Sequence, residues 1–159
     1  MTHMPFQLAQ LNIGRLLAPL EAPEIADFVA ALDAINALAD AAPGFVWRFQ
    51  TESGDATAVR PYDDDRIIVN FSVWDSMDAL HQYVYRSGHA EVLARRREWF
   101  TRMTDAFLVL WWVPAGHRPS PEEAVARLEH LRQHGPSAHA FTFKQPFPSP
   151  GEAHPDTIA

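Results

Sequence analysis

The sequence predicts an α+β domain in which one antiparallel sheet carries helices on one face. Strand-like segments with alternating or continuous apolar residues lie at 7–14, 45–50, 66–74 and 107–113. Apolar residues at helical spacing lie between the first and second of these segments, and again between the third and fourth. The resulting order, β-α-β-β-α-β, is the split βαβ arrangement of ferredoxin-like folds.

The first half of the chain supplies a strand, a helix and a strand. Residues 7–14 alternate in hydrophobicity and predict the first strand. The following helix is expected to begin near Pro23, which suits a first helical turn, and to stop at Pro43. Residues 45–50 predict the second strand, and the polar residues 51–65 predict a long connection.

The second half repeats the pattern with a longer helical region. The strand at 66–74 is followed by a helix over 77–86. Gly88 interrupts the helical pattern, and a second helical segment is expected over 89–103. Residues 107–113, FLVLWWV, are apolar on both faces, which indicates a strand that is buried on both.

A further helix and strand are predicted after this sheet. Ser120-Pro-Glu-Glu reads as a capping box, in which Ser120 caps the helix and Glu123 reaches back to the cap. The helix is expected to end near Gly135, and residues 139–144 are expected to form a short last strand. The fold class is therefore α+β, a ferredoxin-like sheet with an added C-terminal helix and strand.

Size and composition restrict the function classes. The chain has 159 residues, 47% of them hydrophobic, which fits one domain over residues 1–145 and a Pro-rich flexible tail over 146–159. A net charge of −7 argues against nucleic acid as a partner. The absence of cysteine excludes disulfides and thiolate metal sites. No secretory signal or membrane-spanning stretch is recognisable, so we expect a cytoplasmic protein without a membrane partner.

The second face of the sheet also needs a cover. The helices are expected on one face, and the other is expected to carry Trp47, Trp74 and one side of residues 107–113. A second copy of the sheet is the simplest cover, which predicts a homodimer closed as a dimeric α+β barrel.

Polar residues recur on one face of three predicted strands, and these residues are Gln10, Asn12, Arg48, Asn70 and Ser72. If this face lines a closed cavity, they are convergent polar groups among apolar and aromatic residues such as Trp74, as in small-molecule sites. The alternative is an open sheet with a solvated face. Arg48 has its own alternative, an ion pair with an acidic residue across the sheet.

The predicted helix over 89–103 places His89, Arg96 and Phe100 on one otherwise apolar side. There His89 could take a proton from an acidic phenol or enol, and Arg96 could hold the resulting oxyanion. The alternative is that His89 begins the helix and Arg96 extends to water.

Two further groups of residues carry candidate chemistry. Tyr83 or Tyr85 could donate a hydrogen bond into the cavity, and the alternative is a buried tyrosine at a packed interface. His130 and His134 have the i, i+4 spacing that can grip a metal, but the sequence offers no third ligand nearby. We therefore expect no metal site.

Three stretches carry a family resemblance: NALADAAPGFVWRF, IIVNFSVWDSMDALHQYVYRSGHAEVLARRREWF and FLVLWWVPAGHRPSPEEAVARL. Together, over residues 6–145, they resemble a bacterial family of uncharacterised domains. That family is similar to the antibiotic-biosynthesis monooxygenases of the dimeric α+β barrel superfamily. The specific parts are Trp-Asp-Ser at the helix start and Ser-x-His at 87–89. Those monooxygenases often carry another histidine five residues before this one, where this chain has Val84.

The resemblance implies cofactor-independent oxygenation of a hydrophobic, aromatic or polyketide-like substrate. In that scheme His89 is the base, Arg96 or Arg48 holds the anion, and Asn70 with Asn12 orients the substrate. The substrate would also contact the side chains of Ser72, Trp74, Tyr85 and Phe100. Two alternatives stay open. One is a haem protein with His89 as axial ligand, and the other is a non-redox cyclase, isomerase or ligand-binding module.

Overall fold

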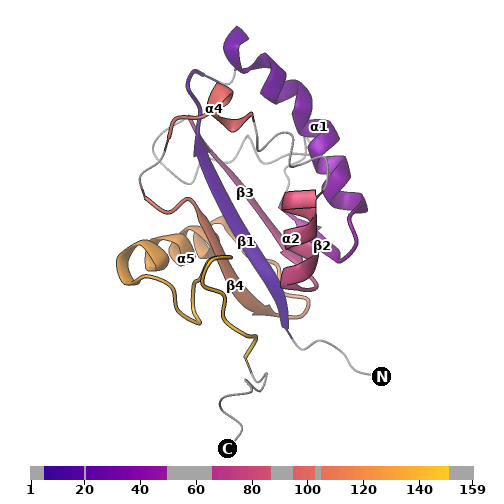
Figure 1. Cartoon of the computed structure of the whole chain (residues 1–159), viewed down its shortest axis with the longest axis vertical. Helices are drawn as coiled ribbons and strands as arrows, with labels where there is room; N and C mark the ends of the chain where they lie inside the picture. Colours follow the sequence, from indigo (N-terminus) through magenta and orange to yellow (C-terminus); the bar gives the residue numbers. More distant parts are fainter. Residues whose placement is uncertain (1–5, 20, 50–65, 87–94, 103–104, 151–159) are drawn as a thin grey trace, which may run out of the picture.

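The computed structural model describes residues 6–19, 21–49, 66–86, 95–102 and 105–150. Its centre is a four-stranded antiparallel sheet of β1 (Phe6–Arg15), β2 (Phe45–Arg48), β3 (Ile67–Trp74) and β4 (Leu108–Pro114), shown in Figure 1. The strand order is β2-β3-β1-β4. This confirms the predicted ferredoxin-like α+β fold, in which the first strand becomes a central strand.

The helices follow the predicted order. They are η1 (Pro23–Ile25), α1 (Ala26–Ala41), α2 (Met77–Arg86), α4 (Arg96–Trp99) and α5 (Pro121–His134). The start and end of α1 and the start of α2 agree with the sequence prediction to within a few residues. For α1, Pro23 and Pro43 stand close to the two ends. Within the described residues, no helix combines the length and hydrophobicity needed to cross a membrane.

Helices α1 and α2 cover one face of the sheet (Figure 1). Trp74 and Leu110 of this face pack with Leu80 and Tyr83 of α2, and the rings of Trp74 and Tyr83 are 5.0 Å apart. The expectation that Trp74 lies on the face turned away from the helices is therefore wrong. The apolar stripes of α1 and α2 need apolar partners, and Trp74 is the largest one that β3 offers.

Helix α5 lies on the opposite face, against β1 and β4. Its buried residues Ala124, Leu128 and Leu131 join a core cluster with Leu11 of β1 and Trp111 of β4. Helix α5 thus covers the part of the second face formed by β1 and β4. The sequence had suggested that a second copy of the sheet would cover this face.

The start of α5 is tied to the sheet by one carboxylate. Ser120 Oγ accepts a hydrogen bond from the backbone N of Glu123 at 3.1 Å, which confirms the predicted cap. The Glu123 carboxylate does not reach back to the cap. It accepts from Trp111 Nε1 at 3.0 Å and lies 2.6 Å from His117 Nε2. The buried indole N–H needs an acceptor, and Glu123 supplies it.

Two predicted elements, the helix over 89–103 and the strand over 139–144, are shorter or different in the structure. In both, a residue pairs with one that is distant in sequence. Only Arg96–Trp99 of the helix predicted over 89–103 is helical among the described residues, and Phe100 forms a β-bridge with Leu16. The strand predicted at 139–144 is reduced to an isolated bridge between Phe141 and Leu110.

Histidines gather where the segment after α5 meets that helix. The ring of His130 lies 4.6 Å from that of His134 and 4.4 Å from that of His139. Arg127 Nη1 donates to the backbone O of His139 at 2.9 Å and lies 3.0 Å from its Nδ1. Partial burial, the charge of Arg127 and the neighbouring His130 lower the pKa of His139 below its usual 6.5.

We expect the free energy of unfolding to decrease as the pH falls from about 7.5 to about 5.5. The pKa of His139 is lower in the folded state, so the unfolded chain binds more protons below pH 6.5. His139→Gln should flatten this pH dependence in urea titrations, while the exposed His81 serves as control through His81→Gln. Equal slopes for wild type and His139→Gln would contradict the expectation.

A close approach near the end of β1 depends on Gly14. A Cβ at this position would lie 2.6 Å from two ring carbons of Phe100, which is too close for packed carbon atoms. The absent side chain therefore lets the Phe100 ring lie directly over the strand.

Gly14→Ala is expected to lower the free energy of unfolding by about 1–3 kcal/mol, because the Phe100 ring must move. Chemical denaturation measures this change. Introducing Gly14→Ala into a Phe100→Ala background should cost less than it does in the wild type, since the clashing ring is gone. A cost that is the same in both backgrounds would contradict the role assigned to this contact.

Candidate ligand pocket

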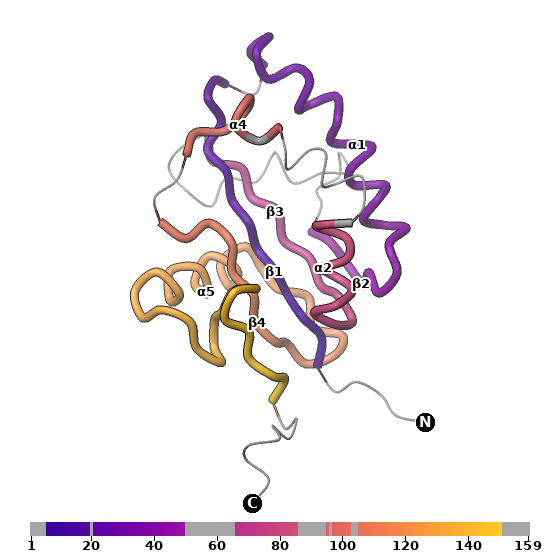
Figure 2. The backbone as a smooth tube through the Cα atoms, viewed as in Figure 1, coloured from indigo at the N-terminus to yellow at the C-terminus, as the bar shows by residue number. Residues whose placement is uncertain are grey.

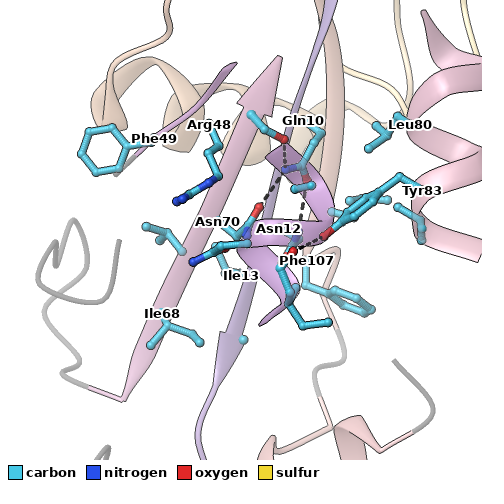
Figure 3. A pocket seen from close by; sticks show the side chains of 18 of the residues that line it. Gln10, Asn12, Ile13, Arg48, Phe49, Ile68, Asn70, Leu80, Tyr83 and Phe107 are labelled. Carbon is cyan, nitrogen blue, oxygen red and sulfur yellow. Dashed lines mark hydrogen bonds between the residues drawn. The ribbon is translucent and has the colours of Figure 1, made fainter. Parts of the chain in front are cut away.

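A cavity of about 460 Å³ lies between the sheet and helices α1 and α2. Helix α1 contributes apolar wall residues such as Phe28 and Leu32, and α2 contributes Leu80 and Val84. Strands β1 and β3 form the floor, and Figure 3 shows the side chains that converge on the cavity. The volume suits a small organic molecule, and the walls favour an apolar one.

The floor of the pocket carries a hydrogen-bonded row of amides centred on Gln10 (Figure 3). Gln10 Nε2 donates to Asn70 Oδ1 at 2.9 Å and to Ser72 Oγ at 2.8 Å. Gln10 Oε1 accepts from Asn12 Nδ2 at 3.1 Å, and Trp74 Nε1 donates to Ser72 Oγ at 2.9 Å. Gln10 and Ser72 are 4% and 5% exposed, so these bonds offset the cost of burying polar groups.

This row determines which polar atoms a ligand meets. Gln10 uses both N–H bonds and its carbonyl oxygen within the row, so it presents no further polar hydrogen to the pocket. The Asn70 carbonyl oxygen is also engaged, and Asn70 is exposed to the cavity. The amide N–H groups of Asn70, and the second N–H of Asn12, are therefore available as donors to an oxygen of a ligand.

Arg48 stands at the edge of the pocket in an ion pair with α1. Its Nε lies 2.8 Å from Asp40 Oδ1, and its Nη2 lies 3.3 Å from Asp40 Oδ2. The arginine side chain is 13% exposed and still lines the cavity. The alternative of an ion pair for Arg48 is thus realised, but the acidic partner comes from a helix and not from a neighbouring strand.

Tyr83 closes the wall on the α2 side. Its hydroxyl donates to the backbone O of Ile35 at 3.1 Å. Burial raises the pKa of Tyr83, the nearby Asp40 adds to the rise, and Arg48 opposes it. Tyr83 therefore stays protonated at neutral pH and acts as a donor.

The structure brings together most of the residues that the sequence suggested for a site. Asn12, Arg48, Asn70, Ser72, Trp74, Tyr85 and Phe100 all line the pocket. His89 lies outside the described residues, and of Arg96 only the backbone in α4 is described. The pocket lies inside one chain, between the sheet and its own helices, and not in a lumen between two sheets.

Several lining residues were not predicted. Phe28, Leu32 and Ile35 belong to the apolar stripe of α1, and Asn36, also in α1, lines the pocket beside them. The helical spacing of these apolar residues was visible in the sequence, but it does not show that they face a cavity. Phe143 also lines the pocket, and no local pattern connects this C-terminal residue with α2.

The histidine cluster on α5 is separate from the pocket. His139 does approach His130, although the sequence placed no third ligand near the His130–His134 pair. Across the part of the chain that is described, no group of three or more His, Asp or Glu side chains is arranged to hold a metal ion. The absence of a bound metal stays a prediction.

Comparison of folds finds similar solved structures at low sequence identity. SnoaB, a cofactor-independent oxygenase from Streptomyces nogalater, is 19% identical with a TM-score of 0.47, over 72% of this chain and 97% of that one. PA3566 from Pseudomonas aeruginosa is 15% identical with a TM-score of 0.48, over 75% and 100%. Rv0793 from Mycobacterium tuberculosis is 16% identical with a TM-score of 0.45, over 72% and 99%. Likeness at this level carries no conclusion about activity.

Comparison of sequences gives a family. No curated protein matches the chain at a significant level. A family model described as a domain of unknown function, DUF3291, matches residues 7–157 and so spans nearly the whole chain. The chain therefore belongs to the DUF3291 family.

Proposed function

We propose that this chain binds a hydrophobic aromatic or polyketide-like molecule in the pocket between its sheet and helices α1 and α2. The observation that supports this most is the cavity of about 460 Å³, with apolar walls and one row of oriented amides on its floor. Apolar walls supply affinity for a ring system, and a few placed polar groups orient it.

The reaction we propose is oxygenation without a cofactor, as the resemblance to antibiotic-biosynthesis monooxygenases implies. A substrate with an acidic CH₂ group loses a proton to become an electron-rich carbanion. This carbanion reacts with O₂, so that CH₂ becomes C=O and the second oxygen atom leaves as water. The protein has to supply a base, donors for the developing oxyanion and a cavity that excludes water.

Residues of the pocket fit two of these three roles. Asn70, oriented through Gln10 and assisted by Asn12, is the proposed donor to the substrate oxygen. Arg48 at the edge, whose guanidinium also pairs with Asp40, is one proposed holder of the anion, and Arg96 is the other. The proposed base is His89, because the described lining contains only Arg48, Tyr83 and Tyr85 as ionisable groups. Histidine is the side chain that most often serves as a general base in enzymes.

A non-catalytic or non-redox function is the second candidate, and the composition of the pocket lining favours it. The described lining contains no carboxylate and no imidazole, so these residues alone form a binding pocket. Such a protein would bind the aromatic ligand without consuming O₂. The haem alternative depends on His89, which lies outside the described residues, and it stays an expectation.

We expect the purified protein to accelerate O₂ uptake with anthrone as substrate. Asn70→Ala should lower kcat about a hundredfold and change KM little, since it removes a donor to the oxyanion. An oxygen electrode measures both constants. The matched control is Gln133→Ala, an amide exposed on α5 on the other side of the sheet.

The two candidates separate in this experiment. Anthrone that binds with no O₂ uptake above its spontaneous oxidation would contradict the oxygenase and favour the binding module. Equal loss of activity in Asn70→Ala and Gln133→Ala would contradict the role of Asn70.

We also propose that the chain forms a homodimer through the part of the second sheet face that α5 leaves. Val46, Trp47, Phe49 and Ile67 pack there at the margin of the core and are only half-buried. The guanidinium of Arg118, just before α5, lies 5.8 Å from the centre of the Trp47 ring. This contact marks the boundary between the surface that includes Trp47 and the part of the face that α5 covers. A second sheet face would bury these side chains.

Light scattering after size exclusion is expected to give twice the chain mass for the wild type. Trp47→Glu should shift the protein toward the monomer, because a carboxylate cannot be buried without a partner. Glu122→Gln, at an exposed position on α5, serves as a control that keeps the dimer. A monomeric wild type at micromolar concentration would contradict the proposal.

A further inference from the structure

The segment that follows α5 returns along the free edge of β4 (Figure 2). Phe141, fully buried, exchanges two backbone hydrogen bonds of 2.8 Å with Leu110. Six residues later the backbone O of Phe147 accepts a hydrogen bond from Trp112 Nε1 at 2.8 Å. The chain between Phe141 and Phe147 is therefore held against the sheet at both ends.

Phe143 lies between these two anchors and reaches the pocket. Its side chain lines the cavity together with Tyr85 of α2. The Phe143 ring is 6.0 Å from that of Tyr85 and 5.6 Å from that of His81, and both pairs are edge-to-face. His81 and Tyr85 are one helical turn apart, with their rings 4.6 Å from each other. We call these three side chains the aromatic rim.

The aromatic rim stands where the pocket meets solvent. Tyr85 is 49% exposed although its ring lines the cavity, and His81 is exposed as well. Aromatic side chains that only fill a core are buried, and these two are not. The Tyr85 hydroxyl has no hydrogen-bond partner among the described residues, so it also offers a polar group at this end.

The cavity thus has two recognition elements from different parts of the chain. The amides on its floor belong to β1 and β3, and they engage an oxygen of the ligand. The aromatic rim belongs to α2 and to the C-terminal segment, and it offers ring edges and faces at distances typical of aromatic pairs. A ligand with one ring can satisfy the first element only, whereas an extended ring system can satisfy both.

We propose that the aromatic rim is a second binding subsite, through which Phe143 selects fused polycyclic ligands over single-ring ones. This inference rests on the proposed function, because it assigns the ligand class of the same pocket. It gives the C-terminal segment a specificity role, since Phe143 is the rim residue that the segment contributes. The C-terminal segment that contains Phe143 would then determine how many fused rings a preferred ligand has.

The test uses phenol, 2-naphthol and 2-anthrol as probes, with dissociation constants from quenching of tryptophan fluorescence. For the wild type, affinity is expected to rise with each added ring. Phe143→Ala is expected to weaken 2-anthrol about tenfold and phenol less than twofold, as the loss of one aromatic contact implies. Phe143→Leu, which restores volume without a ring, should resemble Phe143→Ala. Leu38→Ala, at an exposed position on α1 outside the pocket lining, is the control.

The outcomes separate this inference from the proposed function. A wild type that binds none of the three probes overturns both. A wild type that binds them, with a ratio of 2-anthrol to phenol affinity unchanged in Phe143→Ala, overturns the rim alone. If circular dichroism shows that Phe143→Ala does not fold, Tyr85→Ala decides. Its ring is half exposed, and a folded Tyr85→Ala with the wild-type ratio also overturns the proposal.

Discussion

The architecture of the pocket depends on one buried amide in the central strand. Gln10 stands in the middle of β1, which pairs with β3 on one side and β4 on the other. A buried amide without partners would cost several kcal/mol. Gln10 finds its partners in Asn12, Asn70 and Ser72, and these occupy neighbouring positions on the same sheet face. Gln10 therefore needs these polar neighbours as hydrogen-bond partners, whether or not a ligand binds in the pocket.

One face of the sheet borders a cavity and the other a packed core, and the side chains of β1 explain both. On the face with Gln10, the amides interrupt the apolar surface. Helices α1 and α2 pack beside them, against residues such as Trp74 and Leu110, and a cavity lies over the amides. The opposite face has Leu11, Phe71 and Trp111, and α5 closes on it in a continuous core. A cavity on one side and a dense core on the other follow from the alternation of side chains along β1.

The sequence predicted the elements better than their partners. Strands and helices are local patterns, and the proline, glycine and serine signals placed most of their ends. The alternation in β1 and β3 also showed that Asn12, Asn70 and Ser72 share a face. Local patterns did not show that α1 and α2 cover that face, or that Asp40 pairs with Arg48. The bridges of Phe100 and Phe141, and the approach of His139 to His130, depend on chain segments brought together only by the complete fold.

The contacts of Glu123 and those of the pocket floor close loops of very different length. This carboxylate joins Trp111, twelve residues before it, and His117, six residues before it. The floor of the pocket joins Gln10 to Asn70 across sixty residues. Closing a short loop costs less chain entropy than closing a long one. The corner of β4 and α5 therefore closes at a lower cost in chain entropy than the floor of the pocket does.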